Sequence, residues 1–289
     1  MTDKTYKFLL LLVAIFWGSG FVASQYALDA GWQPFTILSL RGFIAGGILL
    51  LISLKNKIPW YTNQKLWFIL IIGGLLMFLG FALQLYGQKA TSVSMASIFV
   101  GIYVLLTPII ASFFKKNYLT LKLFIACSIA FVAILIACYS GGALVFGWGE
   151  FLLLLSSLLF ASHFLVIESL SSYKIAFVVS GVQLLVMGFA AMIMSFISGE
   201  NYHLHTEALG SILYLAIVCS GATLVLQSYA QEKVNSTMAS LIVSSESIFG
   251  VLGAVLIYGD QFSWNIALGC CLMFLAIIMM DIKFQKIKD

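Results

Sequence analysis

Ten apolar segments, each long enough for one membrane crossing, follow one another along the chain. A helix crosses the roughly 30 Å hydrocarbon layer with about 20 mostly apolar residues. Helices suit these segments because lipid offers no partner for a free backbone N–H or C=O group, whereas the strands of a β-barrel would alternate polar and apolar residues. The sequence therefore predicts an all-α membrane protein with ten transmembrane helices, at about 8–28, 34–54, 66–86, 92–114, 119–139, 151–168, 175–197, 209–229, 236–258 and 263–281.

The composition agrees with this prediction. Charged residues make up 9% of the chain and hydrophobic residues 62%, whereas a soluble domain carries roughly 25% charged residues. The first segment is longer than the apolar part of a signal peptide and no small-residue cleavage site closes it, so we expect it to be retained. The five cysteines lie inside apolar segments without the spacing of metal ligands, and we expect no metal, cofactor or disulfide bond.

The lysines indicate how the chain lies in the membrane. With a cytoplasmic N-terminus, ten crossings place 13 of the 14 lysines at cytoplasmic ends and leave only Lys89 outside. Because positively charged residues are enriched in cytoplasmic loops, we expect both termini in the cytoplasm. The net charge of +4 is then a signal of topology, and it does not indicate nucleic-acid binding.

The second half of the chain repeats the first at a fixed distance. Residues 83–97 read LQLYGQKATSVSMAS and residues 226–240, which lie 143 positions later, read LQSYAQEKVNSTMAS, so seven of the fifteen residues are identical. Residues 8–12 and 151–155 both read FLLLL at the same offset. One residue is dropped around the second and seventh helices, after which the register returns.

The number of helices in each copy fixes how the two copies are related. We expect five helices in each of two repeats, residues 1–143 and 144–289. Because five is odd, the second copy enters the membrane from the opposite side, which makes an inverted-topology repeat. In many secondary transporters with this architecture the substrate binds near the midplane between the halves, which rock to give alternating access. A duplicated bundle without transport is the alternative.

Several short motifs stand in a defined order along both halves. In the first half they are FWGSGF at 16–21, RGF at 41–43, TSVSMAS at 91–97 and Pro108; in the second they are NSTMAS at 235–240, Glu246 and YGD at 258–260. In a chain of 289 residues with ten helices, this order resembles the drug/metabolite transporter superfamily, in its bacterial EamA-type branch. The match covers essentially the whole chain. Two departures from the pattern are Val251 in place of Pro108 and Phe160 in place of Trp17.

The resemblance implies a function as well as a fold. It implies a central cavity lined by helices 1–4 and 6–9, with helices 5 and 10 at the periphery. It also implies a carrier in the bacterial inner membrane, acting as a monomer or homodimer, that exports a small organic metabolite such as an amino acid. An importer or exchanger of a nucleobase, a choline-like cation or S-adenosylmethionine is the alternative. An intramembrane enzyme is a remote one, because the chain has no H-E-x-x-H motif.

Two charged residues lie inside apolar segments. Arg41 is the only charge between residues 34 and 54, and an arginine at this depth costs at least about 2.5–3.5 kcal/mol. It either anchors a carboxylate or phosphate of the substrate or binds backbone carbonyls structurally. Glu246 is the only acid well inside an apolar segment, and it either binds a proton or cation or pairs with Arg41. Together the two could hold both ends of a zwitterion.

Further candidates for substrate binding are polar or aromatic. His163 could share protons with the substrate path or bond a neighbouring carbonyl. Gln84 and its repeat mate Gln227 are candidates for cavity lining, whereas Gln88 and Gln231 suit packing at helix ends. The resemblance implies that Gln183 occupies the place that corresponds to Arg41, within the one-residue shift. The aromatic candidates for stacking on an organic substrate are Trp17 and Tyr103.

Overall fold

The computed structural model describes residues 3–55, 64–114, 121–140, 143–144, 146–200 and 206–281. The orientation predicted above rests in part on Lys57, Lys115, Lys116, Lys283, Lys286 and Lys288, which lie outside this part of the chain. The described elements are α1 (Asp3–Asp29), α2 (Pro34–Lys55), α3 (Gln64–Gln88), α4 (Val93–Val100), α5 (Tyr103–Phe114), α6 (Leu121–Ala137), β1 (Tyr139–Ser140), β2 (Ala143–Leu144), α7 (Trp148–Leu170), α8 (Ala176–Ser198), α9 (Leu209–Ala216), α10 (Thr223–Gln231), α11 (Ser236–Val243), α12 (Glu246–Gly253) and α13 (Trp264–Asp281).

Helices account for nearly all of these elements, as the sequence predicts. In the described part of the chain, eight helical spans are long and apolar enough to cross a membrane. Two shorter apolar helices, Phe124–Ala137 and Trp264–Ala276, lie where the fifth and tenth transmembrane helices are predicted. Each of the ten predicted segments therefore coincides with a helical span, and the all-helical membrane fold is confirmed. The antiparallel strands β1 and β2, which are two residues long and lie between α6 and α7, were not predicted.

Two of the spans are broken at equivalent places. The fourth span turns at Gly101 and Ile102, between α4 and α5, and the ninth turns at Ser244 and Ser245, between α11 and α12. These two turns are 143 residues apart. The second parts of the two broken spans begin at Tyr103 (α5) and Glu246 (α12). Their first backbone N–H groups bond carbonyl groups of the turns: Val104 bonds Gly101 at 3.2 Å, and Ser247 bonds Ser244 at 3.1 Å.

The same equivalence holds at the starts of the broken spans. Ser92 caps α4 because its side-chain oxygen accepts a 3.2 Å hydrogen bond from the backbone N–H of Met95. Asn235 caps α11 in the same way, by a 2.9 Å bond from Met238. Both caps satisfy a backbone donor at a helix N-terminus, so the similar motifs TSVSMAS and NSTMAS begin the two spans in the same manner.

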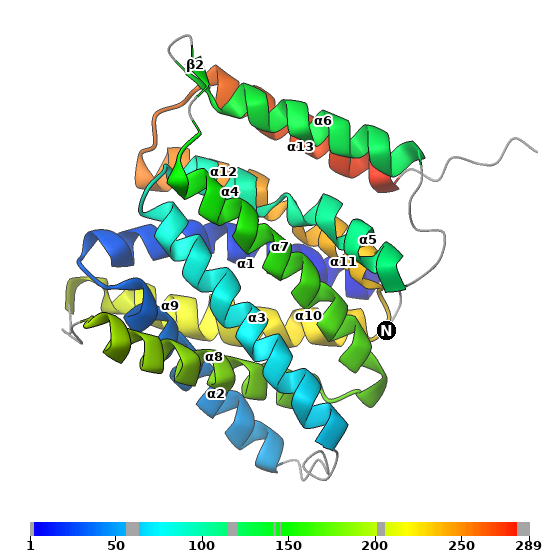
Figure 1. Ribbon diagram of the computed structural model, residues 1–289. Coiled ribbons are helices and arrows are strands. Elements are labelled where there is room, and N and C mark those ends of the chain that lie inside the picture. The colour runs from blue at the N-terminus through cyan, green and yellow to red at the C-terminus, as the bar shows by residue number, and fades with distance from the viewer. Residues whose placement is uncertain are drawn as a thin grey trace, which may run out of the picture.

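The two halves of the chain interlock. α1 packs on α12, α2 on α8 and α3 on α7, and each pair joins one half to the other (Figure 1). Small residues allow these contacts to form at backbone distance: a Cβ atom on Gly42 would lie 2.5 Å from Cα of Gly188, and one on Gly18 would lie 2.5 Å from Cβ of Phe249. Close backbone approach at small residues is the usual way in which helices associate in lipid.

The pair formed by α6 and α13 stands apart from the other helices (Figure 1). These two helices pack mainly against each other, through the fully buried Ala126, Ala130 and Ala133 of α6. On α13, a Cβ atom at Gly269 would lie 2.8 Å from the carbonyl oxygen of Ala133. The peripheral place that the resemblance implies for helices 5 and 10 agrees with this arrangement.

Candidate functional site

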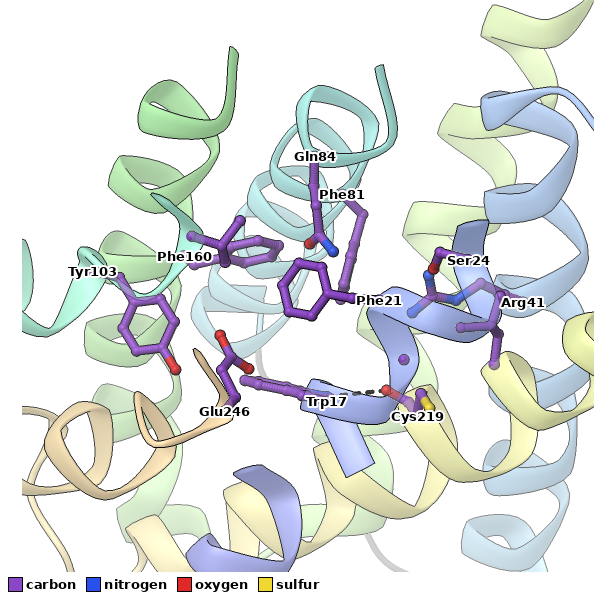
Figure 2. Close-up of a pocket in the computed structure, with 13 residues that line it drawn as sticks. Trp17, Phe21, Ser24, Arg41, Phe81, Gln84, Tyr103, Phe160, Cys219 and Glu246 are labelled. Carbon is purple, nitrogen blue, oxygen red and sulfur yellow. Dashed lines mark hydrogen bonds between the residues drawn. The ribbon is translucent and has the colours of Figure 1, made fainter. Parts of the chain in front are cut away.

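A cavity with about 410 Å³ of empty space lies inside the bundle, among both halves of the chain. Figure 2 shows that polar and aromatic side chains converge on it. Its lining residues are Trp17, Gly20, Phe21, Ser24, Arg41, Phe81, Gln84, Val100, Tyr103, Phe160, Leu215, Cys219 and Glu246. All the spans that the resemblance implies for the lining contribute, except the seventh, α8, which packs behind α2.

One face of α1 forms a wall of the cavity. Trp17, Gly20, Phe21 and Ser24 all line it, and they are spaced at i, i+3, i+4 and i+7, the positions that share one face of an α-helix. The opposite face of α1 meets α12 at Gly18, where a Cβ atom would lie 2.8 Å from the carbonyl oxygen of Glu246. The absence of a side chain at Gly18 therefore lets the first residue of α12 approach the cavity.

Arg41 is held by one hydrogen bond and one aromatic ring. Its Nε donates a 3.0 Å hydrogen bond to Oγ of Ser220, and its Cζ lies 4.6 Å from the centre of the Phe81 ring, within the range of a cation–π interaction. The side chain is 2% exposed. Among the described residues, the guanidinium forms its hydrogen bond through Nε alone, so its two terminal nitrogens remain available to the cavity.

The eighth span contains a π-helical turn at Ile217–Ala222, between α9 and α10. The hydroxyl of Ser220 in this turn donates to the carbonyl oxygen of Leu215 at 2.8 Å and accepts from Arg41. The indole nitrogen of Trp17 donates to the carbonyl oxygen of Cys219 and to Oγ1 of Thr223, both at 3.0 Å. π-Helical turns are often found at functional sites, and here the turn fixes both a cationic and an aromatic lining residue.

Glu246 and Tyr103 face each other across the cavity (Figure 2). Both side chains are buried, at 2% and 1% exposure. The hydroxyl oxygen of Tyr103 points toward the Glu246 carboxyl group. Among the described residues, no ion pair joins Glu246 to Arg41, so the two charged residues line the same cavity without neutralising each other.

The remaining polar lining comes from Gln84 and Ser24. The carboxamide of Gln84 points into the cavity (Figure 2), one helical turn beyond Phe81 on α3. The Gln84 side chain is 7% exposed, and its repeat mate Gln227 differs from it in donating a 3.0 Å hydrogen bond to Oε1 of Gln231. The cavity thus offers a guanidinium fork, a carboxyl group, an amide and two hydroxyls between aromatic rings.

Five of the eight predicted site residues come together in this cavity. They are Arg41, Glu246, Gln84, Trp17 and Tyr103. The other three, His163, Gln183 and Gln227, lie elsewhere in the bundle. His163 and Gln183 are joined to each other by a 2.9 Å hydrogen bond between Nε2 and Oε1, and their role in binding stays a prediction.

The cavity also contains residues that the sequence did not single out as site candidates, chiefly Ser24, Phe81 and Cys219. For Ser24 a signal was available, because it lies three and seven residues beyond Phe21 and Trp17 on the same face of one helix. For Phe81 a signal was available as well, because it lies three residues before Gln84 on one face of α3. Cys219 has no predicted site residue three or four positions away, so no such spacing marked it. In the described part of the chain, no three His, Cys, Asp or Glu side chains gather as a metal site would require.

Comparison with known proteins agrees with this architecture. A solved crystal structure superposes with a TM-score of 0.75 over 97% of both chains at 13% sequence identity, which shows a shared fold. A protein of Archaeoglobus fulgidus described as an uncharacterized transporter is 26% identical over 95% of this chain and 85% of its own. One of Buchnera aphidicola, described in the same words, is 26% identical over 81% of this chain and 80% of its own.

The pattern of one protein family matches the chain twice. The EamA-like transporter family matches residues 4–139 and again residues 147–281. The two matches cover nearly the whole sequence, and they fall on the two halves that the internal repeat separates. The chain therefore belongs to the EamA-like transporter family, as a multi-pass membrane protein.

Proposed function

We propose that the protein is a secondary carrier that exports a small zwitterionic metabolite, such as an amino acid, by alternating access between two inverted halves. This proposal rests on one observation: Arg41 and Glu246 line the same cavity but form no ion pair with each other. A buried charge without a partner is costly. A substrate that brings a carboxylate to Arg41 and an ammonium to Glu246 would remove both costs at once.

The rest of the lining suits the same class of substrate. An arginine fork matches the geometry of a carboxylate, and the Gln84 amide and the Tyr103 hydroxyl offer further hydrogen bonds near it. The rings of Trp17 and Phe160 provide apolar surface for the substrate's side chain.

The direction of transport and the location are proposed on separate grounds. The distribution of lysines supports cytoplasmic termini, and the family resemblance supports export across a bacterial inner membrane. A proton shared with Glu246 would couple transport to the proton gradient; without one, the carrier would equilibrate its substrate. An importer of a nutrient would use the same cavity, so direction has to be measured.

The proposal is tested by transport of a radiolabelled mixture of L-amino acids into proteoliposomes. We expect the wild-type protein to exchange labelled for unlabelled amino acids, and Arg41→Ala and Glu246→Gln each to lower the initial rate at least about tenfold, since a hydrogen bond to a charged group contributes roughly 1.5–3 kcal/mol. Glu207→Gln, a change of an exposed acid outside the cavity, serves as the control. Wild-type rates in both cavity variants would refute the proposed binding role.

A further inference from the structure

Two pairs of lining residues are equivalent positions of the two halves. Trp17 and Phe160 are 143 residues apart in the sequence, as are Tyr103 and Glu246, and all four line the same cavity. In an inverted repeat the halves are related by a pseudo-twofold axis in the membrane plane. Equivalent residues that meet lie close to this axis. We therefore expect these four to line the site whichever side of the membrane it faces.

The other polar lining residues come from one side of this axis only. Arg41, Gln84 and Ser24 line the cavity, whereas their equivalents in the second half are packed away from it. The equivalent of Gln84 is Gln227, that of Ser24 is Ile167, and that of Arg41 is Gln183, within the one-residue shift. These three second-half residues, Gln227, Ile167 and Gln183, are 0–1% exposed.

The packed set contains polar atoms that nothing in the protein satisfies. Nε2 of Gln183, a donor, and Oε1 of Gln227, an acceptor, are both buried without a hydrogen-bond partner. Oε1 of Gln183 bonds Nε2 of His163 at 2.9 Å, and His163 is the equivalent of Gly20, which lines the open cavity. An unsatisfied buried polar group costs about 1–3 kcal/mol, so this donor and this acceptor are expected to find partners in another state.

A narrow crevice lies near this set, at the connection between α7 and α8. Ile167, Val179 and Ser228 are among its lining residues. Val179 lies one helical turn from Gln183, and Ile167 lies one turn from His163, because residues four apart share a helix face. Ser228 follows Gln227 directly. The crevice thus ends about one turn short of the unsatisfied atoms.

We propose that His163, Gln183 and Gln227 form a second binding subsite, which opens when the cavity faces the side of the crevice. It takes the same zwitterion as the open cavity, with the substrate carboxylate on Nε2 of Gln183 and the ammonium on Oε1 of Gln227. This subsite rests on the proposed function for the identity of its ligand. Because neutral amides form weaker bonds to charged groups than a guanidinium does, it holds the substrate less tightly than Arg41 does.

Thiol labelling tests the subsite without knowledge of the substrate. In a chain whose five cysteines are replaced by alanine, Ser24→Cys and Ile167→Cys place single thiols at equivalent positions. We expect membrane-impermeant reagents, anionic MTSES and cationic MTSET, to modify Cys at 24 from one face of oriented vesicles and Cys at 167 from the other. A thiol at 167 that reacts from neither face, while that at 24 reacts, would overturn the subsite.

Three further substitutions test the chemistry of the subsite. In the Ile167→Cys chain, Gln183→Leu should lower the rate of modification by MTSES about fivefold, the factor that one hydrogen bond contributes, and leave the rate with MTSET unchanged. Gln227→Leu should lower the rate with MTSET by a similar factor and leave the rate with MTSES unchanged. Gln183→Glu, which keeps an acceptor for His163, should also slow MTSES. Equal rates in all variants would refute the binding role. If this pattern holds while no amino acid is transported, the proposed function fails and the subsite stands.

Discussion

Gln88 and Gln231 make the same hydrogen bond in the two halves of the chain. Nε2 of Gln88 donates to the carbonyl oxygen of Phe21 at 2.7 Å, and Nε2 of Gln231 donates to that of Phe164 at 2.9 Å. Donor and acceptor are both displaced by 143 residues between the halves. The first bond joins α3 to α1 and the second joins α10 to α7, so the internal repeat extends from the sequence to individual atomic contacts.

We expect Gln88→Leu and Gln231→Leu to have small and similar effects on stability. Each change removes the bond to a helix carbonyl, which keeps its partner within the helix. Each also removes one bond to a neighbouring glutamine, since Gln88 donates to Gln25 at 3.1 Å and Gln231 accepts from Gln227 at 3.0 Å. The free energy of unfolding should fall by about 1 kcal/mol in either variant, as measured by denaturant titration in detergent micelles. Gln261→Leu, at an exposed position, is the control. A loss several times larger in one variant than in the other would contradict the equivalence of the two bonds.

Ser220 is expected to act as a positioning residue for Arg41. Within the described part of the chain, its hydroxyl is the one hydrogen-bond acceptor of the guanidinium. Ser220→Ala should therefore free the fork to rotate and weaken substrate binding about fivefold. Because Ser220 acts through Arg41, the effect should vanish when Arg41→Ala is already present, as a double-mutant cycle measures. Ser211→Ala, at a half-buried serine of the same span that lines neither the cavity nor the crevice, is the control. Additive losses would show that Ser220 contacts the substrate itself.

The sequence predicts some parts of the site and leaves out others for a physical reason. Arg41, Glu246 and Gln84 could be found because polar residues are rare and costly inside apolar segments. Cys219 could not, because no predicted site residue lies three or four positions from it to mark the face of its helix that turns toward the cavity. The same limit explains Gln227: its polarity was recognised, but the sequence does not tell which side of the axis is open in a given state.

The broken spans were also beyond the sequence. The fourth and ninth segments read as continuous apolar runs, and the turns at Gly101 and Ser244 contain no proline. The internal repeat did indicate that whatever occurs in one of these spans occurs in the other, since both positions lie at the same offset. What determines the break is the crossing of the two spans, which is a tertiary contact.

Glu200 is expected to anchor the start of α2. Its carboxylate accepts hydrogen bonds from the backbone N–H of Thr36 at 2.9 Å, from Oγ1 of Thr36 at 3.0 Å and from the hydroxyl of Tyr86 at 3.2 Å. A negative charge at a helix N-terminus is favourable. Glu200→Ala should therefore lower the free energy of unfolding by about 1–3 kcal/mol, measured as above. Glu207→Ala, an exposed acid in the same connection, should leave it unchanged, and equal effects of the two substitutions would contradict the anchoring role.

The crossing of the two broken spans depends on Gly101. A Cβ atom there would lie 2.0 Å from Oγ of Ser247, which donates a 2.9 Å hydrogen bond to the carbonyl oxygen of Ser97. Gly101→Ala should therefore displace Ser247 and destabilise the fold by about 1–3 kcal/mol, and Ser247→Gly in the same chain should restore part of the loss by removing the clashing hydroxyl. Gly47→Ala is the matched control, because nothing lies within 4 Å of a Cβ atom at that position. Unfolding of the variants in detergent measures the effect; if Gly101→Ala proved as harmless as Gly47→Ala, the close crossing of α4 and α12 would not exist in the protein.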